Sequence, residues 1–280
     1  MIREAICNLI DLALSEDIGD GDHSSLACIP DKATGKSRLI IKEAGIIAGI
    51  DIAAYVFQRI DKRIKLSECL TDGSKVKPGD TGFIAEGPIQ SLLKSERLVL
   101  NIIQRMSGIA TTTRMYVDAV KDYSVKILDT RKTTPGFRVF EKEAVRIGGG
   151  VNHRMGLFDM IMLKDNHIDY AGGISNAILK ANEYLKETNK DLPVVIEARN
   201  MDELRLILNQ GMINRIMLDN FSIPETEFAV KLVNGRYEIE SSGGITLETV
   251  RSYAKCGVDY ISIGALTHHI NSMDISLKAI

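Results

Sequence analysis

The sequence contains no tryptophan, few prolines and only four cysteines among its 280 residues. The cysteines are far apart and form no CxxC pair, so neither a disulfide framework nor a zinc site is expected from Cys7, Cys28, Cys69 and Cys256. No apolar run approaches the roughly 20 residues that a membrane-spanning helix needs. The first residues form an amphipathic pattern and not a secretion signal. These absences predict reduced thiols and a cytoplasmic location.

A large excess of either charge is also missing, since the formal net charge is -2. Bulk electrostatics therefore do not favour binding to nucleic acid or to a membrane surface, and an anion site must depend on a local field. Three motifs are absent as well: the GxSxG elbow, the HExxH helix and a GxGxxG turn after a strand. Their absence argues against a hydrolase triad, a zinc protease and a doubly wound dinucleotide-binding sheet.

The first hundred or so residues show a mixed α/β pattern. Helical spacing of apolar residues predicts a helix over 2–16, and an acidic turn follows over 17–22. The aspartates of this turn do not have EF-hand spacing, so we expect a solvated turn that caps the next element. Further on, the pattern predicts a strand over 37–43, a helix over 49–60, and strand, turn, strand over 75–82.

A long helical pattern begins near Ser95, is interrupted by Gly108 and continues over 109–120. We place the domain junction here, which gives an N-terminal domain over 1–112 and a catalytic domain over 113–280. Arg97 and Arg105 lie on this pattern. Taken one at a time, each is expected to be an ordinary solvated arginine of a helix.

Beyond residue 120, short apolar runs alternate with helical patterns. Such alternation is typical of βαβ units and a parallel sheet. A further strand near Val151 would make the set nearly large enough to close a barrel. The predicted strands are 125–128, 160–163, 193–196, 215–218, 237–240 and 260–263, and the predicted helices are 174–185, 201–208, 224–233 and 246–254.

Ionisable and glycine residues stand where these strands end. In a β/α barrel the chemistry lies at the carboxyl ends of the strands, and loops after the last strands commonly bind phosphate. Glu197 and Asp219 together could bind a hard cation, most plausibly magnesium carried in by a substrate phosphate. The stretch 129–167, with its two basic clusters, is typical of a polyanion pocket. The strand ends hold Arg131, Lys132, Lys164, Glu197, Asp219, Ser242, Gly243, Gly244, Gly264 and Ala265.

His153, Asp165 and His167 could also be considered as a metal site. Their spacing does not match HExxH, and hydrogen bonding within loops is the preferred interpretation.

Several motifs, in this order along the chain, resemble those of the quinolinate phosphoribosyltransferases, also called nicotinate-nucleotide pyrophosphorylases (carboxylating). They are EDIGDGDHSS, the Ser95-Glu96-Arg97 triplet, MSGIATTTR, ILDTRKTTPG, GGGVNHRMGLFDMIMLKDNH, IMLDN, SSGGI and SIGALTHH. The resemblance covers nearly the whole chain.

The resemblance implies an α/β fold with an N-terminal α/β sandwich and an incomplete, roughly seven-stranded TIM-like α/β barrel. The tail from about residue 268 would pack back on the first domain. It further implies a homodimer in which each barrel mouth faces the neighbour's N-terminal domain. The implied reaction transfers phosphoribosyl from 5-phosphoribosyl 1-pyrophosphate to quinolinate and gives nicotinate mononucleotide, pyrophosphate and carbon dioxide, in de novo NAD synthesis.

The resemblance also implies roles for individual residues. Arg131, His153 and Arg154 would hold the quinolinate carboxylates, with Arg97 reaching in from the partner subunit. Lys132 and Lys164 would face the pyrophosphate and the reacting centre. Glu197 and Asp219 would hold the ribose hydroxyls and substrate-borne magnesium, and no organic cofactor is expected. The remaining substrate-binding residues, mainly for the 5′-phosphate, would be Thr130, Ser242, Gly243, Gly244, Ile263, Gly264 and Ala265.

Three alternatives remain at this point. The chain could be a molybdenum-locus homologue of the same fold, a nicotinate-type phosphoribosyltransferase, or a non-catalytic sensor of a phosphorylated metabolite. Retention of both the carboxylate-binding arginines and the acidic pair favours the enzyme, since a sensor would need only the phosphate cradle.

Overall fold

The structure is a computed structural model that describes the backbone of residues 2–280 and the side chains from Glu4 onward. The chain forms two compact units, and neither is continuous in sequence. The first unit comprises the residues up to Arg114 together with Thr133–Gly149 and Ala265–Ile280. The second unit comprises Met115–Lys132 and Gly150–Gly264.

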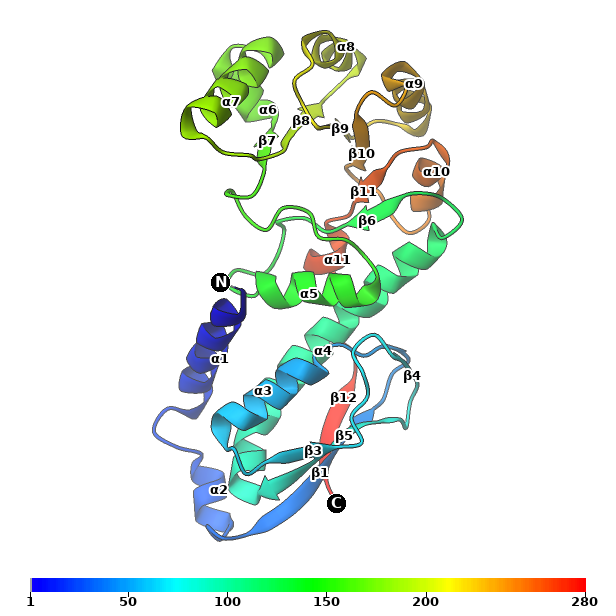
Figure 1. Cartoon of the computed structure of the whole chain (residues 1–280). Coiled ribbons are helices and arrows are strands. Elements are labelled where there is room, and N and C mark those ends of the chain that lie inside the picture. Colours follow the sequence, from blue (N-terminus) through cyan, green and yellow to red (C-terminus); the bar gives the residue numbers. More distant parts are fainter. Residues whose placement is uncertain (1) are drawn as a thin grey trace. The chain divides into compact units, whose positions relative to one another are not determined.

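The first unit contains an antiparallel sheet of strand order β12-β1-β5-β3 (Figure 1). Strand β12 comes from the tail of the chain and pairs with β1, with Ile41 opposite Ile275. The sequence patterns did not predict this strand, because its partner lies at the other end of the chain. The strands are β1 (Thr34–Ile41), β3 (Lys65–Ser67), β5 (Thr81–Pro88) and β12 (Ile275–Ala279), with a separate pair β2 (Gly45–Ile46) and β4 (Lys75–Val76).

Helix α1 of the first unit was predicted from the sequence. The short helix α2 that follows it was not. Asp22, from the acidic turn, is the N-cap of α2 and accepts the Ser25 N–H at 3.1 Å, which confirms the expected capping role. Helix α3 packs on the sheet through Phe57, whose ring meets that of Phe83 edge-on with centroids 5.7 Å apart. The helices are α1 (Ile2–Ile18), α2 (His23–Cys28), α3 (Ile50–Ile60), α4 (Ile89–Ala119), α5 (Arg138–Gly148) and α11 (Ala265–His268).

Helix α4 differs from its prediction, because it begins earlier and runs without interruption through Gly108. A Cβ at Gly108 would lie 3.1 Å from the backbone carbon of Asn271, so the glycine admits a neighbouring segment of backbone and does not break the helix. The boundary expected between residues 112 and 113 falls inside this helix. Residues up to Arg114 belong to the first unit and Met115 onward to the second.

The second unit contains a parallel sheet of order β6-β11-β10-β9-β8-β7, so all six predicted strands are confirmed. The strand expected near Val151 is reduced to a single parallel bridge between Val151 and Leu128. Every residue of β8 is buried, as in a parallel sheet covered on both faces. The strands are β6 (Lys126–Leu128), β7 (Ile161–Leu163), β8 (Val194–Ala198), β9 (Arg215–Asp219), β10 (Glu238–Ser242) and β11 (Tyr260–Ser262).

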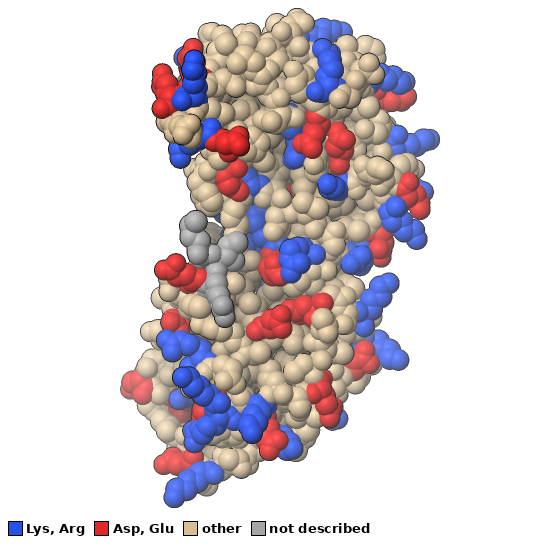
Figure 2. Space-filling model, viewed as in Figure 1, with Lys and Arg blue, Asp and Glu red and all other residues tan. Residues whose placement is uncertain are grey.

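Helices alternate with these strands along the chain, and Figure 1 shows them along the outside of the curved sheet. Four were predicted, and the short helix α6 was not. On the face shown in Figure 2, lysine and arginine side chains are interspersed with aspartate and glutamate, in keeping with the small net charge. In the described part of the chain, no helix is both long and apolar enough to cross a membrane. The helices are α6 (Asp165–Ala171), α7 (Ile174–Thr188), α8 (Met201–Gln210), α9 (Ile223–Val233) and α10 (Val250–Lys255).

Candidate functional site

The register of the parallel sheet aligns the predicted site residues of the second unit along one edge. Leu163 pairs with Ile196, so Lys164 and Glu197 follow at neighbouring strand ends. Asp219 pairs directly with Ser242 at the ends of β9 and β10. Because parallel strands all point the same way, their carboxyl ends and the loops after them share one edge of the sheet.

Lys164 and Glu197 form an ion pair through Nζ and Oε1. The Glu197 side chain is only 8% exposed, whereas that of Lys164 is 43% exposed and lies open to an incoming group. The backbone of Lys164 is fixed by its N–H, which donates to His167 Nδ1 at 3.0 Å in the capping box of α6. His167 therefore has the loop hydrogen-bonding role preferred from the sequence.

The turn after β10 is shaped by the turn after β9. The Asn220 N–H donates to the Ser242 carbonyl at 2.8 Å, and Asn220 has a left-handed backbone with φ of 57°. Gly243 follows with φ of 97°, and a Cβ there would lie 2.9 Å from the Asn220 nitrogen and would also clash with its side chain. Gly244 is left-handed as well, with φ of 61°. Two such glycines in succession turn backbone N–H groups outward, and within residues 2–280 these two N–H groups donate to no other part of the chain.

The loop that carries His153 and Arg154 is held by two buried carboxylates. Asp129, fully buried at the end of β6, accepts the His153 N–H at 2.8 Å. Glu240, fully buried in β10, lies 3.2 Å from His153 Nε2. The other ring nitrogen, Nδ1, accepts the Arg154 N–H at 2.7 Å. Both ring nitrogens of His153 are thus engaged within the chain, and its side chain is only 4% exposed.

Arg154 is a largely buried cation beside a second cation. Its Nη1 donates to the Met160 carbonyl at 3.3 Å, and the residue is 9% exposed. Burial, and then the charge of Arg131, lower the pKa of Arg154, against the weaker opposite effects of Asp159 and Glu197. A largely buried guanidinium whose charge is disfavoured by a neighbouring cation would be stabilised by an anion.

The remaining predicted residues lie in loops and on helices. The Thr130 hydroxyl accepts the Lys132 N–H at 3.0 Å, which holds a tight turn in which Arg131 and Lys132 are exposed. The Ile263 N–H donates to the Leu128 carbonyl at 2.9 Å, and Gly264 and Ala265 come directly after it. Arg97 lies on α4 in the first unit, where it is exposed.

Comparisons with known proteins identify the family. The model for the quinolinate phosphoribosyl transferase N-terminal domain matches residues 22–107, and the model for the C-terminal domain of the same family matches residues 109–278. The chain belongs to the quinolinate phosphoribosyltransferase family.

Individual members of this family are similar over nearly the whole chain. A quinolinate phosphoribosyltransferase [decarboxylating] 1b of Nicotiana tabacum is 45% identical, covering 96% of this chain and 81% of the relative. A probable nicotinate-nucleotide pyrophosphorylase [carboxylating] of Bacillus subtilis is 41% identical, covering 94% and 89%. The crystal structure of NadC from Streptococcus pyogenes superposes with a TM-score of 0.92 at 38% identity, covering 98% of this chain and 97% of that one. The two-part fold, a sheet domain followed by a parallel-strand α/β domain, is therefore that of the phosphoribosyltransferase family.

Several residues that shape the site of this phosphoribosyltransferase were missed by sequence reasoning. Asp129 and Glu240 hold His153 from positions 24 and 87 residues away along the chain. The available signal for Glu240 was a second glutamate inside a short strand, two residues after Glu238. Glu238 and Glu240 face the same side of the strand, but one of two such residues can be buried while the other is exposed. Asn220 lies in the IMLDN motif, from which no role was predicted for it.

The described side chains contain no group of three or more histidine, cysteine, aspartate or glutamate residues that could hold a metal ion. All four cysteines are free thiols. Glu197 and Asp219 therefore remain as a pair of carboxylates on adjacent strands. A pair of hard oxygen donors suits an ion such as Mg²⁺, which keeps several water or substrate ligands and seldom uses an all-protein cage.

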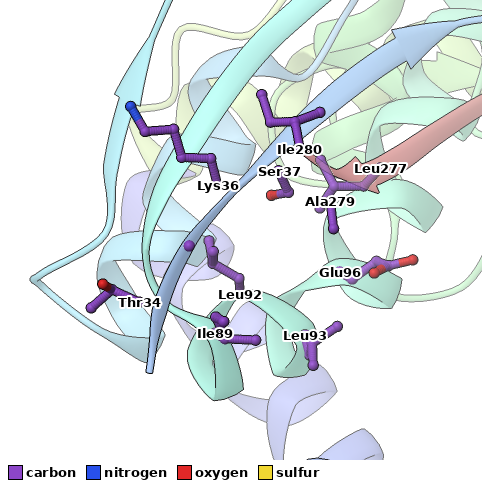
Figure 3. A pocket seen from close by; sticks show the side chains of 11 residues that line it. Thr34, Lys36, Ser37, Ile89, Leu92, Leu93, Glu96, Leu277, Ala279 and Ile280 are labelled. Atoms are coloured by element: carbon purple, nitrogen blue, oxygen red, sulfur yellow. The ribbon is translucent and has the colours of Figure 1, made fainter. Parts of the chain in front are cut away.

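A cavity of about 300 Å³ lies within the first unit (Figure 3). Its lining is mainly apolar and comes from β1, the first turns of α4 and β12. The Ser37 hydroxyl lines it, is buried and has no hydrogen-bond partner among the described residues. None of the site residues predicted from the sequence contributes to this lining, which includes Thr34, Lys36, Ile89, Leu92, Leu93, Glu96, Leu277, Ala279 and Ile280.

Proposed function

We propose that this family member transfers the phosphoribosyl group of 5-phosphoribosyl 1-pyrophosphate to the ring nitrogen of quinolinate, with loss of carbon dioxide. The products would be nicotinate mononucleotide and pyrophosphate, in de novo NAD synthesis. One observation carries the proposal furthest: the largely buried Arg154 guanidinium has a second cation, Arg131, close enough to disfavour its charge. Quinolinate presents two adjacent carboxylates, and planar guanidinium groups bind carboxylates through paired hydrogen bonds that lysine cannot form.

The glycine turn after β10 would bind the 5′-phosphate of the ribose. Gly243 and Gly244 supply two consecutive left-handed residues whose N–H groups have no acceptor elsewhere in residues 2–280. Ser242 adds a hydroxyl beside them, and Ile263, Gly264 and Ala265 follow the neighbouring strand. Backbone N–H groups in such a concave turn bind phosphate oxygens without needing a cationic side chain.

The lysines and the acidic pair would act on the bond that breaks. As pyrophosphate departs, the ribose gains oxocarbenium character, and the carboxylates of Glu197 and Asp219 would offset that positive charge. Lys132 and Lys164 would stabilise the negative charge that develops on the leaving group. Mg²⁺, which arrives with the pyrophosphate, would supply further charge neutralisation there. The pyridinium formed on the ring nitrogen is an electron sink, so the adjacent carboxylate leaves as carbon dioxide without a covalent enzyme intermediate.

The assembly proposed for this activity is a homodimer in the cytoplasm. Arg97 is exposed on α4 in the first unit, far along the chain from every other predicted substrate-binding residue. We propose that it completes the carboxylate site of the partner subunit. No nucleic acid or membrane partner is part of the proposal.

The deciding experiment incubates the purified protein with quinolinate, 5-phosphoribosyl 1-pyrophosphate and Mg²⁺ and follows both products. Release of carbon dioxide in equal amount to nicotinate mononucleotide supports the proposal. Turnover of nicotinate but not quinolinate would overturn it and identify a nicotinate-type enzyme. Binding of the phosphoribosyl substrate without turnover of either pyridine would identify a sensor, or a homologue with a different acceptor such as the molybdenum-locus type.

A further inference from the structure

We infer that Glu240 is a positioning residue for carboxylate recognition: it fixes the tautomer of His153, and through that ring it fixes the backbone of Arg154. The inference deepens the proposed function and rests on it, because Arg154 is the side chain that would meet the quinolinate carboxylate. Glu240 itself is fully buried and would not touch substrate.

The tautomer follows from the two hydrogen bonds of the ring. Nδ1 lies 2.7 Å from the backbone nitrogen of Arg154, whose N–H can only donate. Nδ1 must therefore be the unprotonated acceptor, and the ring proton must be on Nε2. Nε2 lies 3.2 Å from Glu240 Oε2, which accepts that proton in a hydrogen bond. A proton on Nδ1 would point at the Arg154 N–H, so the geometry places the ring proton on Nε2 and not on Nδ1.

The Glu240 carboxylate is ionised, because it has a cation of its own. Arg215 Nη1 donates to Glu240 Oε2 at 3.1 Å, and the guanidinium stacks on the Tyr260 ring with its central carbon 3.8 Å from the centroid. The arginine charge offsets the charge of the buried carboxylate, so Glu240 can remain an acceptor for His153. The same carboxylate oxygen, Oε2, thus contacts both the Arg215 guanidinium and the His153 ring.

The consequence for Arg154 is a backbone held at two successive peptide groups, one on each side of His153. Asp129 accepts the His153 N–H at 2.8 Å, and the His153 ring accepts the Arg154 N–H. The Arg154 side chain itself donates one hydrogen bond within the described residues, from Nη1 to the Met160 carbonyl. A guanidinium fork binds a carboxylate well only when its plane is aimed, so this backbone clamp would set the direction of the fork.

The chain offers a matched control in Glu238. This carboxylate contacts the same cation, since it accepts from Arg215 Nη2 at 3.0 Å, but it is 48% exposed and has no contact with His153. Glu240→Gln and Glu238→Gln each remove one charge next to Arg215. Only Glu240→Gln also changes the acceptor that orients the histidine ring, because an amide can present an N–H group to Nε2.

The kinetic test compares both variants with the unmodified protein. For Glu240→Gln we expect the KM for quinolinate to rise roughly 10- to 100-fold, as a small misplacement of a substrate-positioning group would cause. The KM for 5-phosphoribosyl 1-pyrophosphate should not change, nor should either constant in Glu238→Gln. A Glu240→Gln protein that is folded by circular dichroism yet has an unchanged KM for quinolinate overturns the positioning role.

A spectroscopic test can be made on the unmodified protein, and a variant is needed only to assign the signals. Nitrogen-15 spectra of the imidazole rings of the unmodified protein should show the His153 ring protonated on Nε2 and unprotonated on Nδ1, with its signals assigned by their loss in His153→Gln. The chain has only 5 histidines, so overlap is small. A proton on Nδ1 at neutral pH overturns the inference. Absence of quinolinate turnover in the unmodified protein would instead overturn the proposed function, and the ring spectrum would still decide the tautomer.

Discussion

At the scale of single residues, the turn after β10 depends on the absence of one methyl group. Gly243 combines a left-handed φ of 97° with close approach to the Asn220 backbone and side chain. Any other residue there would add both backbone strain and a steric clash. The same turn presents the N–H groups assigned to the phosphate, so structure and binding have the same requirement at this position.

Gly243→Ala should therefore weaken both stability and phosphoribosyl binding. We expect a loss of about 2 kcal/mol in the free energy of unfolding from strain and displacement of Asn220, together with a raised KM for 5-phosphoribosyl 1-pyrophosphate. Gly235→Ala is the control, since Gly235 has a φ of 71° but open space around its Cα. It should lose about 1 kcal/mol from strain alone and keep its KM. Urea unfolding and initial rates measure the two quantities, and equal effects of both variants would contradict the argument.

At this scale, the sequence showed charged residues directly after short apolar runs that were predicted to be strands. Lys164, Glu197 and Asp219 were found because a parallel sheet gathers its strand ends on one edge, whatever the loops do. Asp129 and Glu240 were not assigned, because their partner His153 is set by tertiary structure and not by spacing. Short-range pattern thus predicted which charged residues lie at the strand ends, but not the buried carboxylates that hold the neighbouring loop.

At the scale of elements, α4 and α5 are joined by a buried ion pair. Arg105 on α4 donates to Glu141 Oε1 at 2.7 Å, and Glu141 on α5 is fully buried. The same carboxylate accepts the Thr134 N–H at 3.1 Å, and Arg105 also donates to the Thr267 carbonyl at 2.8 Å. The expectation that Arg105 is a solvated helix arginine was wrong, because its partner lies on a helix that the sequence patterns did not predict.

Arg105→Leu should be strongly destabilising, since it leaves the Glu141 charge buried without its cation. We expect a loss of about 3 kcal/mol in the free energy of unfolding, measured in urea. Arg59→Leu breaks a pair with Asp11 in which both side chains are about half exposed, so it should cost far less than Arg105→Leu. The double variant Arg105→Leu/Glu141→Leu should recover part of the loss. If the double variant were no more stable than Arg105→Leu, the cost would not come from the unpaired carboxylate.

Helix α9 provides a pH-dependent test at the same scale. Glu225 accepts from the Ser222 hydroxyl at 2.6 Å and the Ser222 N–H at 2.8 Å, and these bonds lower the pKa of Glu225. A carboxyl group whose pKa is lower in the folded state stabilises the fold above its unfolded pKa of about 4.3, and loses that effect as the pH falls through the folded value. The stability advantage of the unmodified protein over Glu225→Gln should thus be constant near neutral pH and shrink in acid.

The control for this test is Ser222→Ala, which removes the hydroxyl donor. In that background the pKa of Glu225 should move toward its ordinary value, and the pH dependence of the Glu225→Gln difference should flatten. Unfolding free energies from pH 3 to pH 7 would show it. If the stability advantage of the unmodified protein grew toward acid, its sign would be wrong, and the hydrogen bonds between Ser222 and Glu225 would be excluded as its source.

At the scale of the whole molecule, the segments of the two units alternate along the chain. This alternation was the feature of the fold that sequence patterns predicted least. The six parallel strands were predicted because short runs of β-forming residues recur along the chain, with helical patterns between most of them. The tail strand β12 and helix α5 belong to the first unit although they follow α4 in sequence. Their partners are β1 and α4, and no local periodicity records such long-range pairing.

The proposal that Arg97 completes the site of the partner subunit can be tested with hybrid dimers. Arg97 belongs to the first unit, and Lys132 to the second. If Arg97 completes the partner's site, a dimer of one Arg97→Ala chain and one Lys132→Ala chain has one site with both residues intact. A twofold dimer exchanged at random from equal amounts would then recover about one quarter of the unmodified activity, because half of the dimers are hybrids and each has one working site of two.

The two homodimers are the necessary controls, and each should be inactive or nearly so. Exchange must be verified independently, for example by mass spectrometry of chains that differ in isotope labelling. If exchange is complete and the Arg97→Ala/Lys132→Ala mixture remains inactive, Arg97 acts within its own chain, because only a site built from one chain loses a required residue in every hybrid.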